Sequence, residues 1–349
     1  MARSKGKIKV QYEALKELRE ELGLTRSIVC DEIGWTADKL IRVEEGTSGN
    51  TKNTVKYVED LCKYYKVEDT SKYLNYDFRE TKFIVFGMGK GGVTKTTSVS
   101  EITFYLQQQY NVLVIDGDPQ TNLTKRMADD DIPIEKNLVD LISVDEENIP
   151  NIKITDYITE TRFGSHCDMI ASSVGLYSAD RKLSNRYMPF AAFNHMKDEI
   201  TKLGKYDYVL IDTSPYLSTY TMGLYLLTDK LYIPTTLEPD SLEAMPSYID
   251  SLNDISKLLR VMKRDHDFKI NGIFFTRVDK RSSVQKAIRE DFKEFIGNKF
   301  RILEMEVPVY AGISNAHYGR MQLGEYNNKD ERAKMVNNIY KKIAREVIK

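Results

Sequence analysis

The pattern of apolar and polar positions changes character near Lys82. Residues 11–67 place apolar side chains at spacings of three and four, as in Leu15, Leu18 and Leu22, which is typical of short amphipathic helices. Three glycines separate these expected helices: Gly23, Gly34 and Gly46. From Lys82 onward, short β-branched runs alternate with turns and helix-like stretches. The pattern therefore predicts a small helical unit followed by a larger α/β unit.

Four of these runs predict strands of the α/β unit: K-F-I-V-F-G at 82–87, V-L-V-I-D-G-D at 112–118, Y-V-L-I-D-T-S at 208–214 and I-N-G-I-F-F-T-R at 270–277. Strands that alternate with helices indicate a doubly wound, mostly parallel sheet, which binds ligands at the carboxyl ends of its strands. The expected organisation is a small all-α domain at residues 1–70, a linker at 71–81 and an α/β domain at 82–349.

Composition narrows the class of protein only a little. A chain of 349 residues fits about two domains, and 41% hydrophobic with 30% charged residues is ordinary for a globular protein. The 51 basic and 52 acidic side chains nearly cancel, so any DNA-binding surface has to be local.

Cysteine usage and the chain start predict a cytoplasmic protein. The cysteines Cys30, Cys62 and Cys167 form no C-x-x-C pair, which indicates neither a disulfide framework nor a zinc site. The basic first residues lack the apolar run of a signal peptide, and no stretch approaches about 18 apolar residues. We therefore expect no membrane association.

The stretch G-M-G-K-G-G-V-T-K-T-T, residues 87–97, lies between an expected strand and an expected helix. This is the context of a phosphate-binding loop, in which glycines let backbone N–H groups approach an anion at the positive end of a helix. Lys95 can then bind phosphate oxygens and the Thr96 hydroxyl can bind Mg²⁺. The pattern G-x-x-x-x-G-K-[ST] requires glycine where Thr94 stands. A tight strand-to-helix turn without a ligand is the alternative.

The same stretch resembles the deviant Walker A box, K-G-G-x-x-K-[ST], of the ParA/MinD family of ATPases. In that family the position of Thr94 is variable and an additional lysine, matching Lys90, leads the box. The resemblance implies an ATP-bound dimer in which Lys90 reaches the partner's nucleotide. It also implies ATP contacts along the loop, at Gly89, Lys90, Gly91, Gly92, Val93, Thr94, Lys95, Thr96 and Thr97.

Three further segments carry the resemblance. V-L-V-I-D-G-D-P-Q-T-N, at 112–122, resembles the strand-end motif D-x-D-P-Q-x-N, and V-L-I-D-T-S-P, at 209–215, resembles the Walker B motif. V-P-V-Y-A-G-I-S-N-A, at 307–316, is similar to a later nucleotide-binding segment that contributes Pro308, although Asn315 replaces its acid.

The resemblance implies roles for three aspartates. Asp118 matches the carboxylate that positions the attacking water and is assigned a catalytic role with Lys90 and Lys95. Asp116 supports the nucleotide and metal site from behind, whereas Asp212 reaches Mg²⁺ through water beside Thr96. For the strand-end aspartates the alternative is a helix N-cap, because aspartate is a favoured cap.

The head resembles the lambda-repressor-like helix-turn-helix module. It carries L-x-x-L-R-x-x-x-G-L-T, then G-W-T, then E-x-G, with Arg26 where that family usually has glutamine. Thr25 and Thr36 are expected N-caps, and Gly34 is expected to end the first helix of the pair. The second helix, 36–44, would enter the major groove with Thr36, Ala37, Asp38, Lys39 and Arg42 as candidate contacts. With 15 basic and 15 acidic residues in 1–80, docking to a protein remains the alternative.

A second candidate DNA surface lies late in the chain. Between Lys257 and Arg301, 13 Lys or Arg stand against 6 Asp or Glu. ParA-type proteins bind DNA non-specifically through basic residues in this part of the chain, which here implies Arg277, Lys280, Arg281, Lys286 and Arg289. A solvated charged helix is the plainer reading.

The sequence thus predicts a partition ATPase that uses ATP and Mg²⁺, with a nucleoid-associated, cytoplasmic location. Its expected partners are DNA, a second copy of the chain and a ParB-like centromere-binding protein, and its head could also bind its own operator. One alternative is a transcriptional repressor controlled by nucleotide. Another is a MinD-like membrane-associated ATPase, since 331–349 could form an amphipathic helix with Val336, Ile339, Ile343 and Val347 on one face.

Overall fold

The structure is a computed structural model of the whole chain. It describes residues 8–10, 12–47, 52–67, 70, 73–76, 81–164, 166–261, 269–296, 299–326 and 330–349. The chain divides into two compact units, residues 1–80 and 81–349, each of which has its own core. We call them the head and the body.

The described part of the head contains four helices, α1 (Tyr12–Glu21), α2 (Arg26–Ile33), α3 (Ala37–Glu44) and α4 (Lys52–Tyr64). The three capping predictions are confirmed. The Thr25 hydroxyl accepts the Ile28 N–H and the Thr36 hydroxyl accepts the Lys39 N–H, each at 3.3 Å. Gly34 ends α2 with φ 67°, a left-handed conformation that glycine adopts without steric cost. The α2–turn–α3 pair is therefore a helix-turn-helix.

The structure corrects the expectation that the head is all-α. Strands β1 (Ile8–Val10) and β2 (Leu74–Tyr76) pair antiparallel in a two-stranded sheet. Three residues are too few to show an alternating pattern, and the pairing joins the two ends of the head, so no local signal predicts it. Residues 74–76 of the expected linker thus belong to a strand, whereas 71–72 and 77–80 lie outside the described residues.

The body is built on a seven-stranded sheet of order β5-β6-β4-β7-β3-β8-β9, in which only β5 pairs antiparallel. The four predicted strands are present as β3 (Lys82–Phe86), β4 (Val112–Gly117), β7 (Tyr208–Thr213) and β9 (Lys269–Thr276). Three strands were not predicted: β5 (Thr159–Glu160), β6 (Cys167–Ile170) and β8 (Lys230–Thr236). The doubly wound, mostly parallel α/β fold is confirmed.

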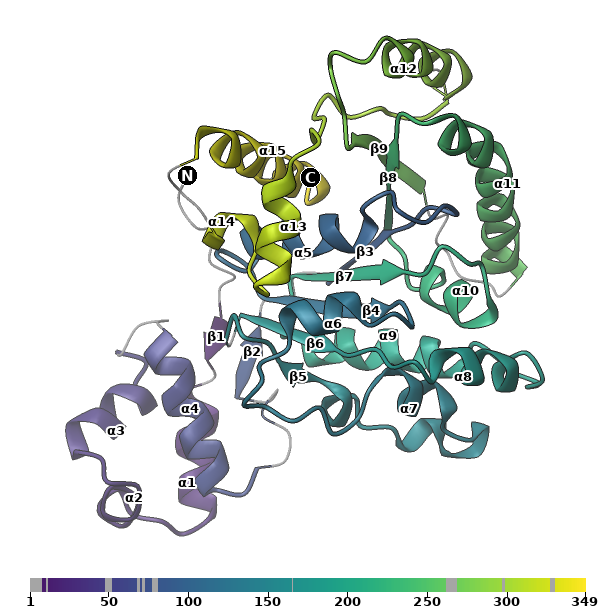
Figure 1. Cartoon of the computed structure of the whole chain (residues 1–349). Coiled ribbons are helices and arrows are strands. Elements are labelled where there is room, and N and C mark those ends of the chain that lie inside the picture. The colour runs from purple at the N-terminus through teal and green to yellow at the C-terminus, as the bar shows by residue number, and fades with distance from the viewer. Residues whose placement is uncertain are drawn as a thin grey trace. The chain divides into compact units, whose positions relative to one another are not determined.

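Helices cover both faces of the sheet (Figure 1). Alternate residues of the strands contribute to two cores on these opposite faces. Phe83 and Val85 of β3 face one core, and Ile84 and Phe86 face the other. Side chains of several helices complete the first core: α7 (Leu138–Ser143), α8 (Leu176–Leu183), α9 (Ala191–Leu203), α10 (Thr219–Tyr225), α11 (Pro239–Val261) and α12 (Ser283–Ile296). The second core is completed chiefly by α5 (Lys95–Leu106), α6 (Asn122–Met127), α14 (Leu323–Tyr326) and α15 (Glu331–Val347), beside which lies α13 (Ala311–Tyr318). Two 3₁₀ helices, Glu146–Asn151 and Ile154–Tyr157, precede β5.

The last helix packs on its own domain. Val336, Ile343 and Val347 of α15 are fully buried in the second core, and Ile339 is partly buried against it. The apolar face that suggested a membrane helix is therefore buried against the second core. Among the described residues, no helix is long and apolar enough to span a bilayer.

Candidate nucleotide and DNA sites

The phosphate loop joins β3 to α5 at the middle of the sheet. β3 lies between β7 and β8, and β7 also pairs with β4, so the carboxyl ends of three neighbouring strands meet here. In register, Asp116 of β4 lies beside Asp212 of β7, which lies beside Phe86 of β3. The loop and both strand-end aspartates are therefore brought together as the sequence predicted.

Backbone geometry explains where the loop departs from the standard pattern. Thr94 has φ 67°, in the left-handed region where glycine would be favoured. Its hydroxyl oxygen is buried and has no hydrogen-bond partner among the described residues. The loop thus keeps the conformation of the glycine-containing pattern although its residue is threonine. Gly87 is needed for a different reason, because a Cβ there would lie 1.9 Å from the Tyr225 hydroxyl oxygen.

The two loop lysines have different partners. Lys95 is buried, and its ammonium donates to the carbonyl oxygens of Met88 at 3.2 Å and Lys90 at 3.0 Å. Burial lowers the pKa of Lys95, while Asp212 and Asp118 oppose that shift. The ammonium of Lys90 instead lies 3.0 Å from the Glu238 carboxylate and 3.6 Å from that of Asp240.

Asp212 is a fully buried carboxylate. Among the described residues neither of its oxygens accepts a hydrogen bond of good geometry, and the Thr96 hydroxyl is a nearby donor that acts only on its pKa. Burial raises its pKa, and neighbouring Asp116 raises it further, whereas the Thr96 hydroxyl and Lys95 act in the opposite direction. Orphaned carboxylate oxygens beside a threonine hydroxyl fit the hydrated Mg²⁺ of a nucleotide complex, since Mg²⁺ retains several waters. No cluster of His, Cys, Asp or Glu that could hold a metal ion without nucleotide occurs among the described residues.

Asp116 and Asp118 differ in how they are held. The Asp116 carboxylate accepts the Asp118 N–H at 3.1 Å, the Thr124 N–H at 2.8 Å and the Thr124 hydroxyl at 2.7 Å. Asp116 thus holds the first turn of α6 through Thr124, although the N-cap residue of that helix is Thr121 and not Asp116. Its support of a nucleotide and metal site stays a prediction. Burial raises its pKa to about 6. Asp118 is only partly buried and accepts the Gln120 N–H at 2.9 Å, so its carboxylate borders the site.

The segment around Pro308 lies at the end of β9. Val278 forms a parallel bridge with Pro308, and the Thr276 hydroxyl donates to the Val93 carbonyl of the phosphate loop at 3.1 Å. Pro308 therefore lies close to a strand end that contacts the loop. Its contact with the nucleotide stays a prediction. Cys167 is buried in β6, and burial raises the pKa of its thiol to about 12, as expected of an inert cysteine.

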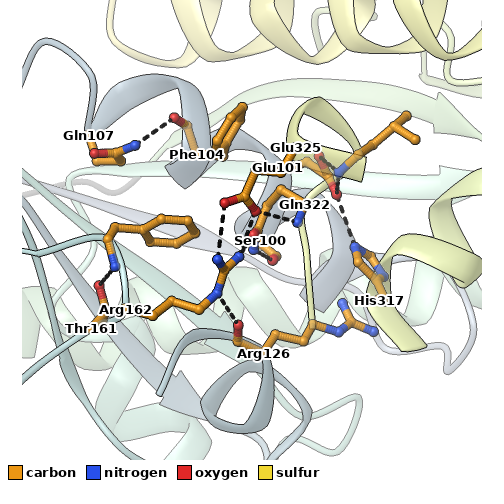
Figure 2. Close-up of polar contacts among 12 residues, drawn as sticks. Ser100, Glu101, Phe104, Gln107, Arg126, Thr161, Arg162, His317, Gln322 and Glu325 are labelled. Carbon is orange, nitrogen blue, oxygen red and sulfur yellow. Dashed lines mark hydrogen bonds and ion pairs between the residues drawn. The ribbon is translucent and has the colours of Figure 1, made fainter. Parts of the chain in front are cut away.

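Sequence reasoning missed a buried polar network between α5 and residues 317–323 (Figure 2). Glu101 of α5 is fully buried, lies 3.0 Å from His317 Nε2 and accepts the Leu323 N–H. Gln322 donates to the Ser100 hydroxyl at 2.8 Å, so two successive residues of α5 hold this segment. The network fixes the helix that follows Lys95 to the segment that follows α13. Its members lie more than 200 positions apart, which no local pattern reveals.

The predicted DNA contacts of the head differ in their exposure and in their partners. Arg42 is exposed on α3, whereas the Lys39 ammonium lies between two rings, 3.9 Å from the Trp35 centroid and 4.0 Å from that of Tyr57. Arg26, which replaces glutamine, pairs with buried Glu44 at 2.8 Å, and Arg19 pairs with the same carboxylate at 2.6 Å. The guanidinium of Arg26 is therefore part of an ion pair inside the head.

The late basic residues also differ in their surroundings. Four of them are exposed: Arg277, Lys280, Arg281 and Lys286. Arg281 pairs with Asp279 at 3.3 Å. Arg289 is mostly buried and lies 2.8 Å from Glu306, with a second contact at 3.1 Å, so we remove it from the candidate DNA contacts. Residues 262–268 and 297–298 of this basic stretch lie outside the described residues.

Comparison with known proteins gives the family. The model of a family described as an AAA domain matches residues 81–269, which is more than half of the chain, and a helix-turn-helix domain model matches residues 13–71. The chain is 24% identical over 238 residues to the sporulation initiation inhibitor protein Soj of Bacillus subtilis, covering 67% of this chain and 87% of that protein. It is also 24% identical to the chromosome-partitioning ATPase Soj of Treponema pallidum, covering 76% of this chain and 97% of the relative.

A solved structure has the same fold as the body. The ATP complex of the D38A variant of Cyanothece McdA matches with a TM-score of 0.60 at 21% identity, covering 74% of this chain and 96% of that chain. The phosphate loop, the strand-end aspartates and these matches agree on one family. This chain belongs to the ParA/MinD-like family of AAA-domain P-loop NTPases and carries an N-terminal helix-turn-helix domain.

Proposed function

We propose that this protein is a partition ATPase of the ParA type, which binds Mg-ATP, dimerises, coats DNA and slowly hydrolyses ATP. The observation that carries the proposal is the unpaired, fully buried carboxylate of Asp212 beside Thr96 and the phosphate loop. A buried carboxylate with no partner is costly, so its retention here is accounted for by a ligand that the site binds. Magnesium with its nucleotide supplies that partner and neutralises charge on the phosphates.

The residues of the body divide the work. Lys95 exchanges the loop carbonyls for phosphate oxygens, and the Thr96 hydroxyl faces the metal. Asp118, on the edge of the site, orients a water molecule for attack, and Asp116 holds the Asp118 backbone and the start of α6 in place. Lys90 binds phosphate oxygens of the partner protomer's nucleotide. Phosphoryl transfer to water needs these positioned charges rather than a covalent intermediate.

The DNA-binding part of the proposal rests on two surfaces. Arg277, Lys280, Arg281 and Lys286 are exposed on the body and provide a cationic surface for non-specific phosphate contacts. Arg42 on α3 of the head provides a contact for specific DNA, which would allow the protein to regulate its own operator. A ParB-like DNA-binding protein is the proposed partner that accelerates hydrolysis, and association with the nucleoid follows from non-specific binding.

One experiment tests the core of this proposal. ATP turnover and binding to a random duplex are measured for the full chain with ATP, ADP and no nucleotide, each with Mg²⁺ and with EDTA. We expect slow turnover and DNA binding only with Mg-ATP. Absence of nucleotide binding would contradict the ATPase assignment, whereas nucleotide binding without any random-duplex binding would contradict only the partition role.

A transcriptional repressor whose oligomeric state responds to nucleotide is the second candidate. The capped helix-turn-helix of the head favours it. A repressor would bind one operator tightly, with little ATP turnover and little affinity for other sequences. Footprinting on the DNA upstream of its own gene, with and without ATP, separates the two candidates.

A further inference from the structure

The side chain of Lys90 is held by two carboxylates of its own chain. Its ammonium lies 3.0 Å from Glu238 Oε2 and 3.6 Å from Asp240 Oδ2, and only 20% of the Lys90 side chain is exposed. Hydrogen bonding by Lys90 is the largest cause of the lowered pKa of Glu238, so this carboxylate is ionised and paired. These two carboxylates therefore compete with a phosphate for the Lys90 ammonium.

The two carboxylates, Glu238 and Asp240, lie at the junction between β8 and α11. Glu238 follows β8 and directly precedes Pro239, the first residue of α11, while its carbonyl accepts the N–H groups of Ser241 and Leu242. Asp240 lies in the first turn of the same helix, where negative charge is favoured by the helix dipole. The acceptor pair thus belongs to a strand-to-helix junction, and Lys90 is the long, flexible member of the contact.

We propose that Glu238 and Asp240 are positioning residues for Lys90, which they hold in the nucleotide-free protomer and release when its ammonium transfers to phosphate oxygens. This inference rests on the proposed function, in which Lys90 binds the nucleotide of the partner protomer. The carboxylates then compete with the nucleotide for one ammonium. They raise the ATP and protein concentrations at which the dimer forms.

The size of the effect follows from exposure. The Glu238 side chain is 42% exposed and that of Asp240 is 82% exposed, so the contact is screened by water. Pairs of this kind change an equilibrium constant by a factor of about two to five. A dimer requires the release of two Lys90 side chains, so the factor applies twice. Loss of the Glu238 charge should therefore strengthen dimerisation by about 4- to 25-fold.

The test compares ATP-dependent dimerisation of the full chain, by sedimentation velocity over a protein concentration series, for the wild type, Glu238→Gln and Asp240→Asn. Asp254→Asn is the matched control, because Asp254 pairs with Lys257 on the same helix, 2.8 Å away, and not with the loop. We expect a 4- to 25-fold lower dimer dissociation constant for Glu238→Gln, a smaller decrease for Asp240→Asn and no change for Asp254→Asn.

A second background distinguishes Lys90 release from a general change in charge. If Glu238 acts through Lys90, Glu238→Gln should not restore ATP-dependent dimerisation to a Lys90→Ala chain, which is expected to lose it, and should leave the nucleotide affinity of that chain unchanged. Restored dimerisation of the Lys90→Ala chain, or no gain in a chain that has Lys90 and dimerises with ATP, would overturn the inference alone. Failure of the wild type and of Glu238→Gln to dimerise at any ATP concentration would overturn the proposed dimer as well.

Discussion

The two buried aspartates of the site predict opposite responses to the same substitution. Asp212 and Asp116 are register partners on β7 and β4, and both are almost completely buried. Asp116 accepts three hydrogen bonds, whereas neither oxygen of Asp212 accepts one from the described residues. We therefore expect Asp212→Asn to stabilise the nucleotide-free protein and Asp116→Asn to destabilise it.

The expected magnitudes follow from hydrogen-bond energetics. An unsatisfied buried group costs about 1–3 kcal/mol, and more when it is charged. Above the folded pKa of Asp212, replacing its carboxylate with an amide removes the charge but also a favourable interaction with Lys95, so the net gain there should be about 1 kcal/mol. In Asp116→Asn an amide NH₂ would face N–H donors, at a cost of about 1–3 kcal/mol. For a unit of this size, each kcal/mol shifts the Tm by about 2–4 °C.

The effect of pH on Asp212→Asn has a definite sign. The folded-state pKa of Asp212 is raised above that of the unfolded chain, so the wild type gains stability from this group at low pH and loses it as pH rises through the folded pKa. Asp212→Asn should consequently equal the wild type in acid, gain on it as pH rises from about 4 to the folded pKa of about 8, and keep that advantage at higher pH.

Calorimetry of the wild type and both variants, from acid to alkaline pH, checks this reasoning. Adding Mg-ATP should raise the Tm of the wild type. At a free Mg-ATP concentration one hundred times its dissociation constant, the free energy of unfolding should increase by about 2.7 kcal/mol, and by much less for Asp212→Asn. A lower Tm for Asp212→Asn than for the wild type without nucleotide would refute the argument, because it would mean that the carboxylate is well paired in the resting protein.

Three further predictions concern the proposed activity. Lys95→Ala should abolish ATP binding, measured with a fluorescent ATP analogue. Lys90→Ala should still bind ATP as a monomer but lose ATP-dependent dimerisation, measured by light scattering. A normal Lys90→Ala dimer would contradict the proposed contact of Lys90 with the partner's nucleotide. Asp118→Ala should dimerise with ATP but hydrolyse it about 10²-fold more slowly or worse in a phosphate-release assay, because it loses water orientation; unchanged turnover would move that role elsewhere. In filter-binding assays, Arg42→Ala should weaken only binding to the operator, whereas the double variant Arg277→Ala and Lys280→Ala should weaken only ATP-dependent binding to a random duplex. Each lost phosphate contact should lower the slope of log affinity against log salt concentration by about one. Equal losses on both DNAs would refute separate surfaces.

Local patterns predicted the elements whose signals lie within a few residues. The strands β3, β4, β7 and β9 and the caps Thr25, Thr36 and Gly34 were found from the sequence, because β-branched runs and capping chemistry act locally. The strand β8 was not among the predicted strands, although K-L-Y-I-P-T-T is a β-branched run; its proline is unusual for a strand inside a sheet. Recognising it would also have shown Glu238 and Asp240 at a strand end beside the phosphate loop.

Contacts between distant parts of the chain could not be predicted in this way. The sequence assigned Lys39 and Arg289 to DNA because both are cationic and lie in suitable segments. Lys39 lies between the Trp35 and Tyr57 rings, and Arg289 is paired with Glu306. Each partner is set by tertiary packing, so charge counts along the chain overestimate the cations that are available to a ligand.

Thr94 shows why a departure from the phosphate-loop pattern does not mean a lost site. Its φ of 67° is strained for a β-branched residue, and its buried hydroxyl oxygen lacks a partner among the described residues. Both features destabilise the resting protein, so Thr94→Gly should raise its stability by about 1 kcal/mol, while Thr94→Ala should recover only the part due to the hydroxyl. If the hydroxyl also contacts the nucleotide, both variants should bind ATP more weakly and Thr94→Ser should bind it normally. Thermal unfolding with and without Mg-ATP measures both effects, and a destabilised Thr94→Gly chain would show that the left-handed backbone at this position is not strained.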